Sequence, residues 1–433
     1  MSAFTFGLSG IAAMLVLMFL RQPIWLALSL IGVGGNLILN GIGPSKFISG
    51  TAVFDVSSGY GLSVLPLFIL LGEVASGSRM SAELFAAART IMSGTRGGLG
   101  VATVAASGAF GAICGSSLAT ASSMTRIALP EMTRAGYNPA YAASTIAAGG
   151  TLGILIPPSI ILVLYASISE TSIARLFAAS LIPGIFLMLL YIVVTKILAR
   201  REDLAPLEEP ATFGERLAAL LKPWQFFLLF LVTIGGIYAG IFSPTEAASI
   251  GAFTAILIGI ARGTLSIAGL VHAMKASVLI SCALLMIVIG ATIFANFVVQ
   301  TRLPDNLLKL ALDAGLSGWM VMAIIVLIYL VLGCFLEALG MVLITVPVFL
   351  PIIIGYGFDP IWFGVLVVVL VEVGLISPPV GMNLFIIRAQ APELKMMAIY
   401  RGILPFLAAP IVLIILLFVF PALALWLPRV LYQ

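Results

Sequence analysis

Long apolar runs, separated by short polar or charged stretches, fill almost the whole chain. A helical bilayer crossing needs roughly 20 apolar residues. We therefore expect about ten crossings, near residues 6–20, 24–40, 62–76, 140–168, 178–200, 224–241, 244–261, 277–299, 361–388 and 402–427.

Two further apolar stretches, 97–128 and 317–350, are too long for one crossing each. Each has a polar or glycine-bearing midpoint, CGSSLAT at 114–120 and CFLEALG at 334–340. Each stretch is therefore either a re-entrant helical hairpin or a pair of crossings. Segments 80–96 and 303–313 carry charges at helical spacing, which predicts helices lying at the membrane interface.

Composition places the chain among membrane proteins. Of its 433 residues, 62% are hydrophobic and 9% are charged, with a mean hydropathy of +1.23, which excludes a soluble globular protein. The first basic residue, Arg21, follows the first apolar run, so we expect a retained crossing rather than a cleaved signal peptide. The three cysteines lack metal-site spacing, and the net charge of +4 does not indicate a nucleic-acid partner.

The positive charges predict the orientation, because Lys and Arg accumulate in short cytoplasmic loops. If the linker 200–223 is cytoplasmic, 16 of the 21 Lys and Arg residues fall on that side. This arrangement puts both termini outside the cytoplasm. The first hairpin then enters from the cytoplasm and the second from the opposite side. The side assignments are the same if each hairpin is two full crossings, so charge does not decide re-entrancy.

The chain contains an internal repeat. A shift of 221 residues aligns 129–159 with 350–380 without a gap, and six of the seven identical positions are Gly or Pro. In both copies a candidate hairpin precedes a crossing that Gly and Pro interrupt. Four crossings lie between the two copies, so the second runs opposite to the first across the membrane. Such an inverted repeat is typical of secondary transporters that bind their substrate near the midplane.

The interrupted crossings suggest a binding site. The stretch GGTLGILIPPSI, 149–160, would free backbone groups that hydrocarbon cannot satisfy. Unwound carbonyls suit Na⁺, and helix N-termini suit a carboxylate. We expect a cation site at Thr151 with the Gly149 and Gly150 carbonyls, and a repeat-related site at Ser377 with the Gly374 region. The tip Ser116 to Thr120 would add hydroxyls, although such residues also serve as small packing residues between helices.

Among the intramembrane carboxylates, Glu337 at the second hairpin tip is the strongest candidate, because a charge at that depth is costly. It would bind a cation, accept a proton or pair with a helix N-terminus. Glu246 in SPTE fits a capping box, whereas Glu73 and Glu372 are intermediate cases. Asn383 would face substrate or bridge helices.

The sequence does not support an enzyme. GLSG at 7–10 resembles the serine motif of intramembrane rhomboid proteases, but the only histidine, His272, falls in a basic segment expected in the cytoplasm. No HExxH, P-loop or dinucleotide fingerprint occurs in the sequence. We therefore expect transport driven by an ion gradient.

Four motifs in order, GAICGSSLATASS, AAGGTLGILIPPS, IYAGIFSPTEAASIGA and VGLISPPVGMNLF, resemble the large membrane subunit of tripartite ATP-independent periplasmic (TRAP) transporters along nearly the whole chain. The resemblance implies a Na⁺-driven importer of small organic anions, carboxylates or sulfonates, that works as an elevator in a bacterial inner membrane. It implies two partners, a small four-helix membrane subunit and a periplasmic substrate-binding protein.

The resemblance also implies site residues. The first Na⁺ site would use Ser116 and Ser117 with Gly149 to Gly153, and the second would use Glu337, where many relatives have aspartate, with Gly374 to Pro378. The residues expected to contact substrate are Ser117, Thr120, Pro158 and Asn383.

The expected fold is an all-α polytopic membrane protein with two re-entrant hairpins and two broken helices, in an inverted repeat of the elevator superfamily. Its expected parts are N-terminal scaffold helices at 1–61, a first repeat at 62–199, the linker at 200–223, a second repeat at 224–401 and a C-terminal helix at 402–433.

Two alternatives to this function stay open. One is a stand-alone transporter that needs no binding protein, and the other is a membrane interaction subunit without a pathway.

Overall fold

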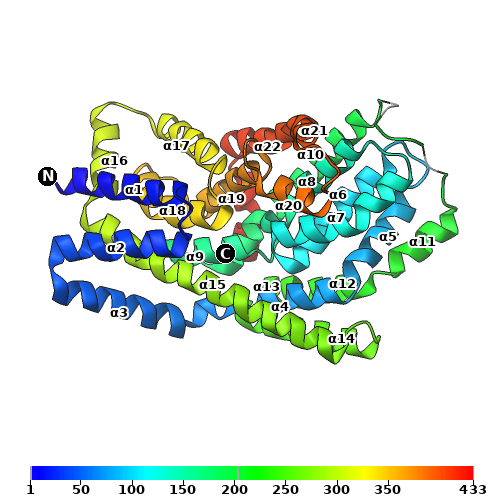
Figure 1. The fold of residues 1–433 in the computed structure, drawn as a ribbon, viewed down its shortest axis with the longest axis horizontal. Helices are drawn as coiled ribbons and strands as arrows, with labels where there is room; N and C mark the ends of the chain where they lie inside the picture. Colours follow the sequence, from blue (N-terminus) through cyan, green and yellow to red (C-terminus); the bar gives the residue numbers. More distant parts are fainter. Residues whose placement is uncertain (1, 202–203, 208, 433) are drawn as a thin grey trace.

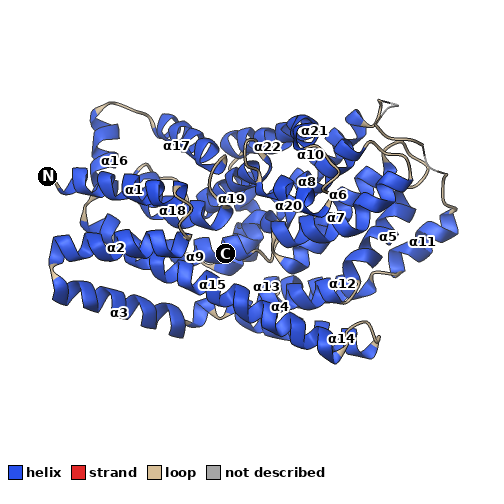
Figure 2. Cartoon of the chain, in the orientation of Figure 1, coloured by secondary structure: helices blue, strands red, loops and turns tan. Residues whose placement is uncertain are grey.

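The structure is a computed structural model that describes residues 2–201, 204–207 and 209–432. Every regular element among these residues is a helix (Figure 2). Seven of the described helices, or eight with one bent pair, are long and apolar enough to cross a membrane. The all-α membrane fold expected from the hydropathy pattern is confirmed.

Each candidate hairpin is two helices joined by a short tip. The first consists of α6 (Gly98–Cys114) and α7 (Ser117–Arg134), and the second of α17 (Gly318–Gly333) and α18 (Ala338–Gly355). The hairpins lie on opposite sides of the molecule in Figure 1, the first on the right and the second on the left.

Each hairpin packs against the broken crossing that follows it. The first broken crossing is α8 (Pro139–Leu155) followed by α9 (Ile160–Ser169). The second is α19 (Pro360–Ile376) followed by α20 (Met382–Gln390). After each break the chain crosses over, so that α9 packs on α18 of the second hairpin and α20 packs on α7 of the first. This exchange brings the two tips and the two breaks together.

The remaining helices surround this centre. α15 (Ile267–Gln300) is the longest and runs diagonally across the molecule in Figure 1, against α2 (Ile24–Asn40), α3 (Ile42–Ser58) and α4 (Val64–Gly77). The other helices are α1 (Ala3–Phe19), η1 (Tyr60–Leu62), α5 (Met80–Met92), α10 (Ile173–Leu198), α11 (Phe213–Leu221), α12 (Trp224–Phe230), η2 (Leu231–Gly235), α13 (Gly236–Tyr238), α14 (Pro244–Ala261), α16 (Leu303–Asp313), α21 (Met396–Ile403), η3 (Leu404–Leu407), α22 (Ala408–Val419) and α23 (Ala422–Leu431).

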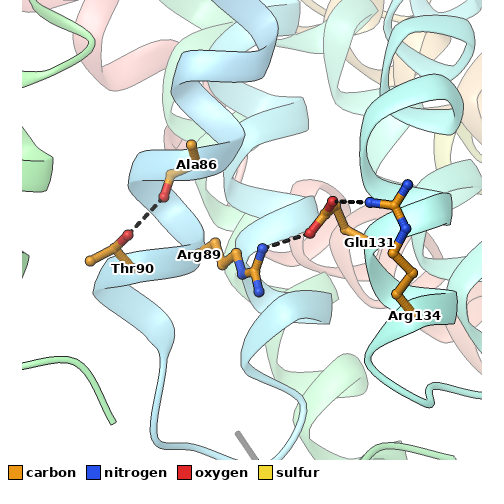
Figure 3. Close-up of polar contacts among 5 residues, drawn as sticks. All are labelled: Ala86, Arg89, Thr90, Glu131 and Arg134. Carbon is orange, nitrogen blue, oxygen red and sulfur yellow. Dashed lines mark hydrogen bonds and ion pairs between the residues drawn. The ribbon is translucent and has the colours of Figure 1, made fainter. Parts of the chain in front are cut away.

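An ion-pair triad ties α5 to the first hairpin (Figure 3). Glu131 of α7 accepts from Arg89 of α5 at 2.6 Å and from Arg134, one turn along α7, at 2.9 Å. All three side chains are partly exposed. Such pairs contribute up to about 1 kcal/mol each, so the triad adds little to the stability of the fold.

Three boundaries differ from those expected. Residues 42–58 form a helix that the apolar-run criterion missed, because Lys46, Asp55 and several Ser and Gly residues interrupt the run. α15 begins at Ile267 rather than 277, so His272 lies on a helix. The expected single helix at 402–427 is divided, because Phe420 leaves helical geometry between α22 and α23. Within the expected linker, residues 202, 203 and 208 lie outside the described residues.

Candidate functional site

The first hairpin tip turns at a glycine in left-handed geometry. Gly115 ends α6 with φ of +63°, and a Cβ there would meet the carbonyl oxygen of Pro158 at 2.8 Å. Ser116 then caps α7, because its side chain accepts the backbone N–H of Ala119. Only glycine combines this φ with so close an approach to another backbone segment. The sequence Gly-Ser therefore places the tip directly on the first break.

The second tip holds a carboxylate at the equivalent position. Glu337 stands at the N-cap of α18, 221 residues after Ser116, but its side chain makes no capping hydrogen bond. Glu337 is only partly buried. The repeat therefore puts a hydroxyl at one tip and an acid at the other.

The two breaks are alike in geometry. α8 ends at Leu155 and α19 at Ile376, and the residues after them, Ile156 and Ser377, are both extended. The following Pro157-Pro158 and Pro378-Pro379 bonds are both cis. Ser159 caps α9, and its hydroxyl also donates to the Ile154 carbonyl. Part of the backbone freed by the first break is thus satisfied within the protein.

A buried hydrogen-bond pair joins the first tip to the second broken crossing. The Asn383 side-chain amide donates to the Ser117 hydroxyl at 2.8 Å and to the Ala147 carbonyl at 3.2 Å. Ser117 Oγ lies 3.1 Å from Asn383 Oδ1 and can donate to it. Both side chains are buried. This pair fixes α20 against α7 at the centre of the molecule.

A cavity of about 340 Å³ opens where these parts meet. Both tips, both breaks and the helices α4 and α15 contribute to its wall. Its polar lining includes Ser116, Ser117, Glu73 and Glu337, and most of the remaining wall is aliphatic. A pocket of this kind, mainly apolar with a few convergent polar groups, is what small-molecule sites share.

The structure brings some of the expected site residues to this cavity. Ser116, Ser117 and Glu337 line it directly, and Asn383 lies behind Ser117. Thr120 donates to the Ser116 carbonyl, and a Cβ at Gly153 would meet that carbonyl at 3.0 Å, so both residues support the first tip. Pro158, Gly374, Ser377 and Pro378 belong to the walls of the two breaks and do not line the cavity.

The expected unwinding from Gly149 is wrong, because α8 is helical through Leu155. The carbonyls of Gly149 and Gly150 therefore lie within the helical hydrogen-bond ladder. The two glycines allow close packing instead, since added Cβ atoms would meet Ser107 Oγ at 2.8 Å and Ala121 Cβ at 2.9 Å. Thr151 bonds to the Ala148 carbonyl and to the Tyr191 hydroxyl, away from the cavity.

The charged side chains that line the cavity are acidic. Glu73 reaches it from α4 and Glu337 from the second tip, and none of its described lining residues is Lys or Arg. Because unpaired like charges are costly to bring together, these carboxylates disfavour a lone anion in the cavity. Ile280 and Leu284 of α15 also line the cavity. No feature of the sequence predicted this.

Comparison with protein families matches residues 11–423 to the family described as "Tripartite ATP-independent periplasmic transporter, DctM component". The chain is 35% identical over 401 residues to the C4-dicarboxylate TRAP transporter large permease protein DctM of Pseudomonas aeruginosa, covering 92% of this chain and 93% of that one. It is 28% identical to the sialic acid TRAP transporter large permease protein SiaM of Vibrio cholerae, covering 95% and 96% of the two chains.

Among solved structures, the fold is similar to that of the Alcanivorax borkumensis YdaH transporter. The TM-score is 0.62 at 16% sequence identity, and the match covers 89% of this chain and 90% of that one. At this identity the similarity shows a shared fold.

Proposed function

Because the chain belongs to the DctM component family of tripartite ATP-independent periplasmic transporters, we propose that it is a Na⁺-driven importer of small organic anions. It is a membrane transport protein and not an enzyme. The proposed substrates are carboxylates or sulfonates, in keeping with the dicarboxylate and sialic acid named for its relatives.

The observation that carries the proposal is the shared cavity. Two hairpin tips and two broken helices, related by an inverted repeat, meet on one pocket whose lining includes two carboxylates and no described basic side chain. Na⁺ ions at the tips would neutralise these carboxylates and let an anion enter, which couples the two solutes. The first Na⁺ would use Ser116, Ser117 and the backbone beside Gly153, and the second would use Glu337 with the break from Gly374 to Pro378.

The proposed cycle is an elevator movement. The hairpins and broken crossings pack on one another and would move as a unit against α4 and α15, which close the other side of the cavity. A small four-helix membrane subunit and a periplasmic substrate-binding protein would complete the transporter. The chain would then lie in the bacterial inner membrane with both termini in the periplasm.

Uptake by proteoliposomes tests the proposal. The purified large and small subunits are reconstituted, and a labelled acid is supplied with the binding protein, after thermal stabilisation of that protein has selected the acid from a panel. We expect uptake only with an inward Na⁺ gradient and the binding protein. Uptake that needs neither would overturn the proposal, and uptake that needs Na⁺ alone would favour a stand-alone transporter.

Variants connect this uptake to the cavity. Ser117→Ala and Glu337→Gln should each lower the initial rate by about tenfold or more, because each removes a proposed ligand of Na⁺, and a hydrogen bond or contact to a charged group is worth about 1.5–3 kcal/mol. Glu246→Gln is the matched control, since Glu246 lies in a capping box that glutamine also forms. If alanine at Ser117 and at Glu337 leaves uptake unchanged, the chain has no pathway at this cavity; alanine at Thr151, which lies away from the cavity, tests only the site expected from the sequence.

A further inference from the structure

A second cavity, of about 500 Å³, shares no lining residue with the first. It is bounded by the start of α8, the end of α10 and the segment from Lys395 to Pro405 that contains α21. α10 reaches Leu198 as a helix long and apolar enough to cross the membrane, so the cavity lies where that crossing ends. This is the depth at which lipid headgroups lie.

Three cationic side chains from two segments line this cavity. Arg201 follows α10, Lys395 precedes α21 and Arg401 lies within it, and all three are exposed. None of the described residues that line the cavity is acidic. Glu393, also exposed, stands two residues before Lys395 and is not part of the lining. Arg201 has a further interaction partner, so Lys395 and Arg401 are the cations that favour a compact anion such as a phosphate here.

Two apolar stripes lead away from the cavity. On α10, every fourth side chain is exposed, counting from the end of the helix beside the cavity. These side chains are Ile197 at 55%, Val193 at 52%, Leu189 at 50% and Ile185 at 42%. α22 starts three residues after Pro405 of the cavity and exposes Ile411, Ile415 and Val419 at the same spacing. α10 and α22 contact each other. The helical spacing keeps each stripe on one face, where an acyl chain can lie along it.

We propose that this cavity binds the phosphate of an anionic phospholipid, whose acyl chains lie along the stripes of α10 and α22. One lipid can contact the cations with its headgroup and the stripes with its acyl chains at the same time, which a free phosphate cannot do. The charge asymmetry of the loops predicts that this cavity faces the cytoplasm, where basic pockets between helices hold anionic headgroups. The assignment is independent of the transported solute.

Native mass spectrometry of the purified complex with its small subunit tests the assignment. We expect phosphatidylglycerol to be retained at lower concentration than phosphatidylcholine of the same acyl chains. In the Lys395→Gln/Arg401→Gln variant, the binding of phosphatidylglycerol should weaken by roughly thirtyfold, since two cations near an anionic headgroup are lost. The matched control is Lys222→Gln/Lys275→Gln, which removes two exposed cations outside the cavity and should bind as the wild type does.

Two further arms separate the possible sources of the phosphate. Inorganic phosphate and glycerophosphoglycerol, which lack acyl chains, should not displace bound phosphatidylglycerol at equal concentration. If either one displaces it, the site binds free phosphate and the lipid assignment is wrong. Equal retention of the two lipids, or wild-type binding by the Lys395→Gln/Arg401→Gln variant, also overturns it.

Discussion

At the scale of single residues, glycines decide how closely the hairpins approach their broken crossings. Gly333 of α17 and Gly374 of α19 face each other, and a Cβ on Gly374 would meet Gly333 Cα at 2.8 Å. Gly111 of α6 and Gly153 of α8 make the corresponding contact in the first repeat, where a Cβ on Gly111 would meet Gly153 Cα at 2.5 Å. Both contacts are between backbones, which cannot give way as a flexible side chain can.

We therefore expect Gly374→Ala to lower the stability of the purified protein by about 1–3 kcal/mol, the usual cost of overpacking. Thermal unfolding of the complex in detergent measures this change. Gly34→Ala on α2 is the control, because a Cβ there meets nothing within 4 Å and alanine favours a helix by up to about 1 kcal/mol. Equal unfolding temperatures for Gly374→Ala and the wild type would contradict the close approach.

At the scale of elements, the two broken crossings begin with the same cap. Asn138 and Asp359, 221 residues apart, each accept two backbone N–H groups at the start of α8 and α19, and proline follows each at the first helical position. The glycines before these caps, Gly136 and Gly357, have φ of +83° and +80°. The repeat visible in the sequence is therefore also a repeat of local geometry.

Asp359→Ala should destabilise the protein by about 1 kcal/mol, because the N–H groups of Ile361 and Trp362 lose their acceptor. Asp359→Asn should retain most of the stability, since asparagine caps the equivalent helix in the first repeat. Thermal unfolding of both variants measures the difference. If the asparagine variant is as unstable as the alanine variant, the negative charge rather than the cap is what α19 needs.

At the scale of the whole molecule, the charge asymmetry predicts the orientation in the membrane. In a background without Cys114, Cys282 and Cys334, Ser2→Cys should react with a membrane-impermeant maleimide added to spheroplasts. Gly214→Cys, on α11 of the linker with nothing within 4 Å of its Cβ, should react only after lysis. The reverse pattern would show the opposite orientation, because the reagent reaches only the outer face before lysis.

Much of the fold was predictable, because a bilayer imposes one length and one polarity on every crossing. The hairpin arms, the broken crossings and the helix at 303–313 lie within a few residues of where apolar runs, prolines and caps predicted them. The start of the first break was not predictable in the same way. Gly149 and Gly150 carry the composition of an unwound segment, yet packing against α6 and α7 keeps them helical.

The sequence by itself determined the membrane class, the inverted repeat and the positions of Ser116 and Glu337 at the two hairpin tips, since all of these follow from local pattern. Only the tertiary structure decided which groups meet. The exchange of α9 and α20 between hairpins sets Ser117 against Asn383, 266 residues away. The packing of α4 on α6 brings Glu73 to the cavity, and the packing of α8 on α10 sets Thr151 against Tyr191. These contacts depend on how helices distant in the chain pack, which apolar periodicity within one helix does not encode.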